Sequence, residues 1–215
     1  PPGVCAGPVI NDHPRNNVSS SVAAKIGKEL HRRPAHPLGI IKERIENYFQ
    51  DDARVRGQPP FQVFDNLPPI VTVEQNFDEL LIPPDHVSRQ PSDTYYVDDQ
   101  RVLRCHTSAH QTTLLRQGES RFLVCGDVYR RDEVDSTHYP VFHQMEGVRI
   151  LTNEEAPVMW TNSKRKEIAG EDLKGSLEGL VTSLFGDVEM RWVDAYFPFT
   201  TPSSELEIFF NVSSV

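Results

Sequence analysis

The chain has few cysteines, no long apolar run and no excess of basic residues. Its three cysteines, Cys5, Cys105 and Cys125, form no CxxC pair and leave an odd thiol, which favours neither a disulfide scaffold nor a zinc site. No apolar run approaches the roughly 20 residues that span a bilayer. The net charge of −9 argues against a surface that coats nucleic-acid phosphates. At 215 residues, the expected class is a globular protein of one fair-sized domain, or of one domain with extensions.

The middle of the chain predicts two strands, Arg121–Tyr129 and Val141–Leu151, joined by a charged loop. This loop is too long for a tight turn and is better placed to reach over a ligand. Four side chains are expected on one face of the hairpin: Arg130, Phe142, Gln144 and Glu146. A charged guanidinium beside a stackable ring suits an anionic, aromatic ligand such as a nucleotide. The residues alone leave open a plain hairpin with a solvated polar face.

Apolar spacing elsewhere predicts further helices and strands. The expected helices are Val22–Leu30, Pro37–Phe49, Glu74–Leu81, one capped by Thr107 or Ser108 that ends near Gly118, and Asp172–Phe185, followed by a Gly186 cap. The expected strands are Phe61–Phe64, Val71–Val73, Val188–Tyr196 and Glu205–Phe210. Residues 1–21 lack periodicity and are expected to be loose, and the polar residues 152–171 are expected to form a flexible connection.

Two pairs near the end of the chain are further candidates. Phe197 and Phe199 flank a proline, so they can present ring faces to a third aromatic group, or they can simply plug the core as an aromatic corner. Glu205 and Glu207 share one strand face, where one of them could help to hold magnesium with nucleotide phosphates. Two exposed strand carboxylates are the commoner case.

Several separated segments carry a resemblance to a known family. The run Tyr129–Asp132 resembles motif 2 of the class II aminoacyl-tRNA synthetases, although the usual glutamate is replaced by Asp132. The run Val141–Gly147, the string Asn76–Pro83 and Asp93–Tyr96 are similar to phenylalanyl-tRNA synthetases, best to the single-chain mitochondrial type. The resemblance covers residues 35 to 210 approximately and keeps its motifs in order and spacing.

This resemblance implies a fold and a domain organisation. The expected fold class is α+β, an antiparallel β-sheet flanked by helices, with a partly flexible N-terminal extension over residues 1–34 and a class II catalytic domain over 35–215. No Gly-Leu-Gly-x-Glu-Arg string of motif 3 occurs in the 215 residues, and the anticodon-binding domain of the mitochondrial type is expected to be absent from them. The chain is therefore expected to be an incomplete catalytic domain.

The resemblance also implies an activity, namely ATP-dependent activation of L-phenylalanine to phenylalanyl-adenylate and its transfer to tRNA(Phe). Arg130 would be catalytic. The implied substrate-binding residues are His106, Ser108, Gln144, Glu146, Phe197 and Phe199, and the implied ATP-binding residues are Arg130, Asp132, His138 and Phe142. The expected cofactors are ATP and Mg²⁺, and the expected protein is a monomer of the mitochondrial matrix without membrane attachment.

Two rival functions stay open. The first is a catalytically inactive class II-like module that binds nucleotide or RNA, which the missing motif 3 arginine favours. The second is a relative that forms a different acyl-adenylate, such as a biotin-ligase-like enzyme. Phenylalanine-dependent pyrophosphate exchange, compared with biotin or lipoate as substrates, separates the three readings.

Overall fold

The computed structural model describes residues 9, 11–131, 139–157 and 159–209, so the candidates Asp132 and His138 lie outside the described residues. The chain divides into two compact units, which are described separately below. The first unit comprises Pro1–Lys42 and Gln62–Val148, and the second comprises Glu43–Phe61 and Arg149–Val215. No helix in the described ranges has the length and apolarity needed to cross a membrane.

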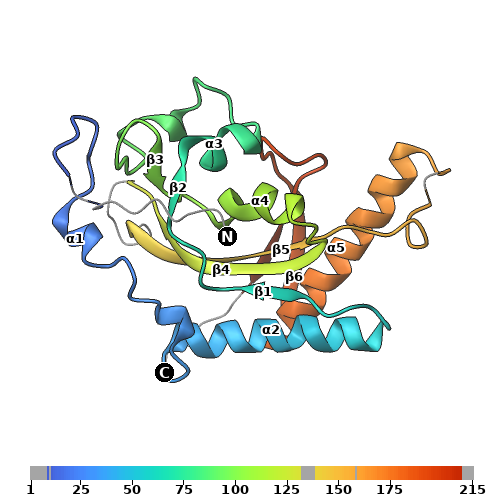
Figure 1. Ribbon diagram of the computed structural model, residues 1–215. Helices are drawn as coiled ribbons and strands as arrows, with labels where there is room; N and C mark the ends of the chain where they lie inside the picture. The colour runs from blue at the N-terminus through green and yellow to red at the C-terminus, as the bar shows by residue number, and fades with distance from the viewer. Residues whose placement is uncertain (1–8, 10, 132–138, 158, 210–215) are drawn as a thin grey trace. The chain divides into compact units, whose positions relative to one another are not determined.

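The first unit contains two small sheets (Figure 1). The larger has the strand order β1 (Gln62–Phe64), β4 (Arg121–Tyr129) and β5 (Val141–Arg149), and β1 runs parallel to β4. The smaller pairs β2 (Ile70–Thr72) with β3 (Arg101–Leu103) in antiparallel fashion. Eight of the nine residues of β4 are buried, which makes this strand the centre of the unit.

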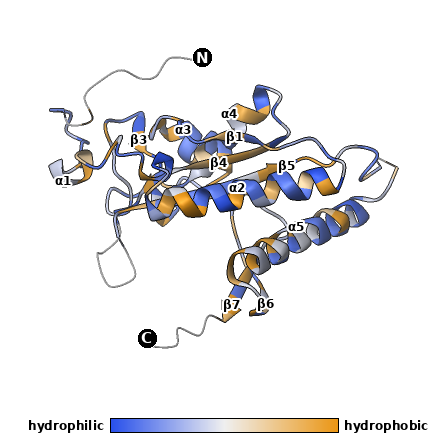
Figure 2. Cartoon of the chain, turned by 90° about the horizontal axis from the view of Figure 1, so that it is seen from below, coloured by the Kyte–Doolittle hydropathy of each residue, from blue (hydrophilic) through white to orange (hydrophobic). Residues whose placement is uncertain are grey.

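Short helical segments surround these sheets. They are α1 (Ser20–Ala23), η1 (Leu30–Arg32), α3 (Val73–Asn76), η2 (Asp78–Leu80), η3 (Val87–Arg89), η4 (Thr107–His110) and α4 (Gln111–Arg116). The longer α2 (Pro37–Val55) begins in the first unit and continues into the second. Polar and apolar residues both recur along α2 (Figure 2), the pattern of a helix with one apolar stripe.

The N-terminal segment is anchored to the core of the first unit. Val18 and Val22 are buried in a cluster with Tyr129 of β4. The side chain of Asn17 accepts a hydrogen bond from the backbone of Tyr96 at 2.7 Å and donates to the carbonyl of Thr94 at 2.9 Å. Residues that were expected to be loose are therefore fixed from position 11 onward by backbone and side-chain bonds.

The second unit contains the end of α2, the long α5 (Asn162–Phe185) and an antiparallel hairpin of β6 (Glu189–Asp194) and β7 (Ser204–Phe209). Tyr48 of α2 donates a hydrogen bond to the carbonyl of Ser176 in α5 at 3.0 Å. A methyl group on Gly179 would collide with the Tyr48 hydroxyl, so this glycine permits the close approach.

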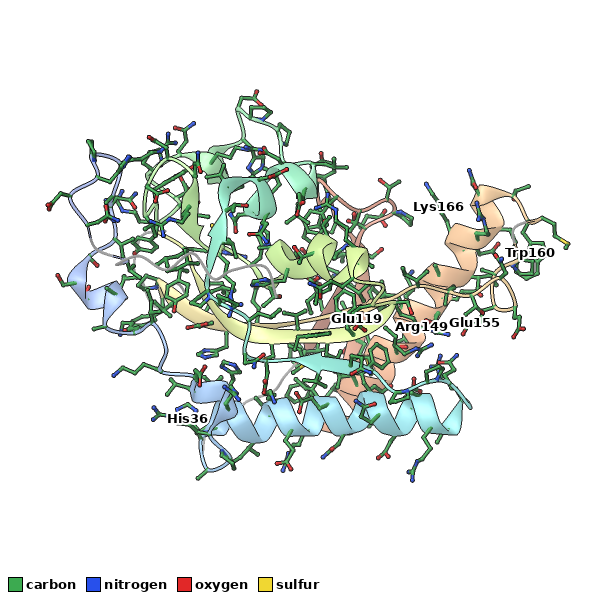
Figure 3. All side chains as sticks on the ribbon, viewed as in Figure 1. His36, Glu119, Arg149, Glu155, Trp160 and Lys166 are labelled. Atoms are coloured by element: carbon green, nitrogen blue, oxygen red, sulfur yellow. The ribbon has the colours of Figure 1, made fainter. Side chains whose placement is uncertain are left out.

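Ion pairs add to the cohesion of the second unit. Arg149 pairs with both Glu155 and Asp172, and Arg56 reaches Asp172 at 2.8 Å. Figure 3 shows Arg149 and Glu155 near one another. These contacts tie the end of α2, the segment after β5 and α5 together.

The α+β class predicted from the sequence is confirmed, and β4 has the predicted bounds. The predicted antiparallel sheet contains one parallel pair, β1 with β4. The strand β5 ends at Arg149, two residues before its predicted end. The helix α2 begins at Pro37 as predicted and extends six residues beyond Phe49.

Two predicted helices are interrupted. The helix predicted over Val22–Leu30 is wrong, because Gly27 and Glu29 adopt left-handed conformations with φ of 75° and 46°. The helix predicted over Glu74–Leu81 divides into α3 and η2 at Phe77, whose φ of −133° is not helical. In both cases a single backbone conformation ends a pattern of apolar residues that favours a helix.

The predicted cap at Thr107 or Ser108 is also wrong, because both residues lie inside η4, and α4 begins only at Gln111. Residues 152–171 were expected to be a flexible connection, yet α5 begins within them at Asn162. Thr161 caps this helix by accepting a hydrogen bond from the Lys164 backbone at 3.2 Å. The predicted cap at Gly186 is confirmed, with φ of 78°.

Candidate functional site

Arg130 follows directly after β4, beside the ring of Phe142 at the start of β5. Its guanidinium carbon lies 5.1 Å from the centre of that ring, and its Nε donates a hydrogen bond to the Cys105 carbonyl at 3.1 Å. The cation–π contact and the carbonyl fix the plane of the guanidinium, and its terminal nitrogens have no hydrogen-bond partner among the residues that the structure describes. The structure thus brings together two residues predicted to hold a nucleotide.

Ser108 of η4 and Glu146 of β5 meet across the first unit. The Ser108 hydroxyl donates a hydrogen bond to one carboxylate oxygen of Glu146. Burial raises the pKa of Glu146, and the hydrogen bond from Ser108 partly offsets that rise. These two predicted substrate-binding residues therefore form one polar pair in a partly buried setting.

Two acceptor atoms next to this pair have no hydrogen-bond partner within the described part of the chain. They are Oε1 of Gln144 and the second carboxylate oxygen of Glu146, and both atoms are buried. Side chains of a strand alternate between its faces, so Gln144 and Glu146 share the face of Phe142. Because a buried acceptor without a partner is costly, this arrangement favours a ligand with several N–H donors, such as an ammonium group.

His106 lies close to the same cluster. Burial, followed by the nearby positive charge of Arg130, lowers the pKa of His106 to about 4. The ring is therefore neutral at neutral pH. A neutral imidazole can accept a hydrogen bond at one ring nitrogen or donate one from the other without adding charge to the site.

A buried network behind these residues was not predicted. Arg104 donates from Nη2 to the Asp127 carboxylate at 2.9 Å and from Nε to the Asp127 carbonyl at 2.7 Å, and its Nη1 lies 2.9 Å from Nε2 of His110. The Tyr129 hydroxyl donates to the other oxygen of Asp127. A methyl group on Gly126 would collide with the guanidinium, so only glycine leaves room for it.

This network joins the segment that carries His106 and Ser108 to the strand that leads to Arg130. The backbone of Tyr129 also donates to the Arg104 carbonyl at 2.9 Å. Burial outweighs the nearby Asp127 and lowers the pKa of Arg104, and burial lowers the pKa of His110 to about 3. The signal that the sequence offered was Asp127 itself, because a carboxylate inside an apolar strand requires a buried partner.

The remaining candidates belong to the second unit. Phe197 is 39% exposed and Phe199 is half-buried, so neither plugs the core of that unit. On β7, Glu205 and Glu207 are both exposed, and Glu207 accepts a hydrogen bond from Arg191 at 2.9 Å. Among the residues that the structure describes, no three His, Cys, Asp or Glu side chains gather as a metal site. The roles predicted for these four residues stay predictions.

Comparison with known proteins agrees with the motifs. Residues 20–214 match the family described as "tRNA synthetases class II core domain (F)". The chain belongs to this class II synthetase family. It is 58% identical over 204 residues to the chloroplastic/mitochondrial phenylalanine–tRNA ligase of Arabidopsis thaliana and 48% identical over 211 residues to the mitochondrial one of Dictyostelium discoideum. The matches cover 94% and 90% of this chain and 46% of each relative, so the class II chain spans about half the length of the curated relatives it matches.

Solved structures of the same class share its fold. Two structures of the pyrrolysyl-tRNA synthetase of Desulfitobacterium hafniense align with TM-scores of 0.54 and 0.55 at 15% and 16% sequence identity. They cover 84% and 86% of this chain and 56% and 60% of the solved chains. At this identity the likeness supports the class II fold alone.

Proposed function

We propose that this chain forms the phenylalanine- and ATP-binding core of a phenylalanine–tRNA ligase. The observation that carries the proposal is the pair of buried acceptors on Gln144 and Glu146, which have no partner among the described residues, beside Arg130 stacked over Phe142. The relatives named above are phenylalanine–tRNA ligases, which supports the choice of amino acid. The reaction would be formation of phenylalanyl-adenylate followed by transfer of the phenylalanyl group to tRNA(Phe).

In this proposal the side chains bind and orient the reactants, and none of them acts as a nucleophile. Gln144 and Glu146 take the substrate ammonium group, which holds the carboxylate near Arg130. Arg130 neutralises the negative charge that builds up on the α-phosphate as the carboxylate attacks it, and its planar guanidinium suits two oxygens at once. Phe142 stacks on adenine. Positioning of the two reactants supplies most of the acceleration.

The remaining assignments depend on the same reaction. His106 and Ser108 hold the amino acid through hydrogen bonds, and Asp132 and His138 contribute to ATP binding. Phe197 and Phe199 form the wall for the phenyl ring. Mg²⁺ enters with the ATP phosphates, because the described side chains offer no cage for it. We infer a monomer in the mitochondrial matrix, in keeping with the mitochondrial names of the relatives.

The direct test is binding of a non-hydrolysable phenylalanyl-adenylate analogue, the sulfamoyl adenosine of phenylalanine, to this chain. We expect Gln144→Leu and Arg130→Gln each to weaken binding by roughly tenfold or more, because each loses hydrogen bonds to a charged group. The matched control is Arg131→Gln, which removes an exposed arginine one position away. Equal affinity of the control and Arg130→Gln would refute the role of Arg130.

The same titration separates the rival functions. Tighter binding of a biotinyl- or lipoyl-adenylate analogue would assign a different acyl group to the site. Binding of ATP without any preference for phenylalanine would leave a nucleotide-binding module. Replacement of Phe199 by alanine tests the phenyl wall, and unchanged discrimination between the phenylalanyl and tyrosyl analogues would count against it.

A further inference from the structure

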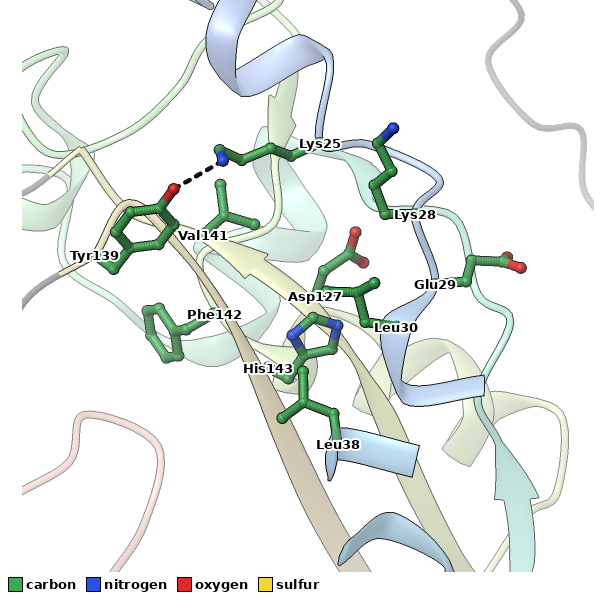
Figure 4. Close-up of a pocket in the computed structure, with 10 residues that line it drawn as sticks. All are labelled: Lys25, Lys28, Glu29, Leu30, Leu38, Asp127, Tyr139, Val141, Phe142 and His143. Atoms are coloured by element: carbon green, nitrogen blue, oxygen red, sulfur yellow. Dashed lines mark hydrogen bonds between the residues drawn. The ribbon is translucent and has the colours of Figure 1, made fainter. Parts of the chain in front are cut away.

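A cavity lies beside β5, with a volume of about 570 Å³ (Figure 4). It is lined by the segment from Lys25 to Leu30, by Leu38 at the start of α2, and by Val141 and His143 of β5. Alternation along the strand directs Val141 and His143 to the face opposite Gln144 and Glu146. Only Phe142, at the start of the strand, also belongs to the candidate synthetase site.

The charges that line this cavity do not cancel. Both carboxylates already have arginine partners, since Glu29 pairs with Arg32 at 3.1 Å and Asp127 with Arg104 at 2.9 Å. The two ammonium groups have no carboxylate partner among the described residues. Lys25 donates a hydrogen bond to the Tyr139 hydroxyl at 2.7 Å, and Lys28 is exposed and forms no ion pair with any described residue. Among the described residues, the wall of the cavity therefore carries positive charge that no carboxylate offsets.

His143 adds a polar atom without a partner. Its ring lies 5.2 Å from that of His31, and its Nε2 is buried without a hydrogen-bond partner within the described ranges. Burial lowers the pKa of His143, so the ring is neutral at neutral pH and can either donate or accept at Nε2. A ligand oxygen near this nitrogen would satisfy it.

The rest of the lining is largely apolar. Leu30, Leu38 and Val141 supply aliphatic surface, and the rings of Tyr139 and Phe142 stand at one edge (Figure 4). Ligand cavities usually combine an apolar lining of this kind with a few placed polar groups, and their volumes range over about 300–1,000 Å³. The composition therefore fits a small ligand that has a flat apolar body and one negative group.

We propose that this cavity binds a small aromatic anion, either an aryl carboxylate or an aryl phosphate. The ring packs against Leu30, Leu38 and Val141. The anionic group lies toward Lys25 and Lys28. Each ammonium group has three N–H donors, so both lysines can still donate hydrogen bonds to the ligand. Nε2 of His143 completes the contacts to an oxygen of the ligand.

Calorimetric titration with phenyl phosphate and with benzoate tests the site and distinguishes its two ligand sources. Benzyl alcohol serves as the uncharged probe. We expect the double variant Lys25→Gln/Lys28→Gln to lose roughly tenfold or more in affinity for the anions, because two charge-assisted hydrogen bonds are removed. Leu30→Trp should abolish binding by filling the cavity. Lys166→Gln, at an exposed lysine of α5 labelled in Figure 3, should leave the affinity unchanged.

A second measurement keeps the result independent of folding. The ¹⁵N shift of the His143 imidazole should move on addition of phenyl phosphate to the unmodified chain. Three outcomes would overturn the proposal: no binding at millimolar probe, equal affinity in the double variant, or complete displacement of the probe by the phenylalanyl-adenylate analogue. The last would assign the probe to the synthetase site. Since the double variant leaves Gln144 and Glu146 intact, failure here is distinguishable from failure of the proposed function.

Discussion

The two units contain the same kind of ion pair in opposite surroundings. Arg104 reaches Asp127 at 2.9 Å with its side chain 1% exposed, and Arg191 reaches Glu207 at 2.9 Å from Nε and 2.5 Å from Nη2 with its side chain 74% exposed. Water screens the second pair and is excluded from the first. The exposed pair has the shorter contact, yet the buried pair matters more for stability, because breaking it leaves a charge buried without a partner, whereas breaking the exposed pair returns both groups to solvent.

The strands that carry these ion pairs differ in burial in the same way as the pairs do. In β4 every residue from Phe122 to Tyr129 is buried, whereas no residue of β6 or β7 is. The first unit is thus stabilised by a packed strand with an internal polar network. The second has fewer buried side chains among the described residues, such as Ala53 and Phe61, and is also stabilised by a helix cap and by ion pairs.

The largest effect is expected from Arg104→Met, which leaves the Asp127 carboxylate buried without its cation. We expect the free energy of unfolding to fall by about 3–5 kcal/mol. Arg191→Met, the exposed counterpart, should cost less than about 1 kcal/mol. Both tryptophans, Trp160 and Trp192, belong to the second unit, so fluorescence follows that unit during urea unfolding. Hydrogen exchange of the β4 amides follows the first. Similar losses in the two variants would contradict the comparison.

Glycine substitutions should change stability in opposite directions in the two units. Gly126→Ala inserts a methyl group against the Arg104 guanidinium and should cost roughly 1–3 kcal/mol. Gly175→Ala lies inside α5 with no neighbouring atom within 4 Å, so it should stabilise by about 0.5–1 kcal/mol. Thermal unfolding of the two variants measures both signs. A stable Gly126→Ala variant would mean that the guanidinium can move aside.

Acid should destabilise the first unit through its neutral histidines. The pKa of His106 is about 4 and that of His110 about 3 in the folded chain, both below the usual 6.5. Below pH 6.5 the unfolded chain therefore binds protons that the folded chain does not. Stability should fall by about 1.4 kcal/mol per pH unit for each histidine as the pH drops toward 4.

The variant His110→Gln isolates one of these histidines, because a glutamine oxygen can still accept from Arg104. Urea midpoints measured from pH 7 to 4 should then decline less steeply than in the unmodified chain. Parallel curves for the two proteins would show that His110 titrates normally.

The smallest effect concerns the start of α5. Thr161→Ala removes the side-chain oxygen that accepts from Lys164 and should cost about 1 kcal/mol. Thr161→Ser keeps that oxygen and should behave like the unmodified chain. Circular dichroism reports the change in helix content. Equal losses in the alanine and serine variants would exclude the cap as the cause.

The strand β4 could be predicted from the sequence because an apolar run of strand-forming residues bounded by polar ones is typical of a buried strand. It failed for residues 22–30, since nothing in the apolar spacing reveals that Glu29 adopts a left-handed conformation. It also missed the first ten residues of α5. There a cap and ordinary helix propensity, rather than an apolar stripe, set the start of the helix.

The part of the candidate site that could be predicted consists of residues close together in the sequence. Arg130, Phe142, Gln144 and Glu146 belong to one hairpin, so alternation alone aligns them. The partnership of Arg104 with Asp127 spans 23 residues and depends on the tertiary fold. The neutral state of His106 likewise depends on burial and on the charge of Arg130, neither of which a linear pattern carries.

The contact between Tyr48 and Ser176 has a consequence for how the second unit tolerates change. The phenol occupies the space that a side chain at position 179 would need. Alanine at position 179 would displace the Tyr48 ring from its contact with α5. A smaller residue at position 48 would leave the space beside Gly179 empty. Substitutions at positions 48 and 179 are therefore expected to be coupled. A residue larger than glycine at 179 should be tolerated only where the tyrosine at 48 has been replaced by a smaller residue.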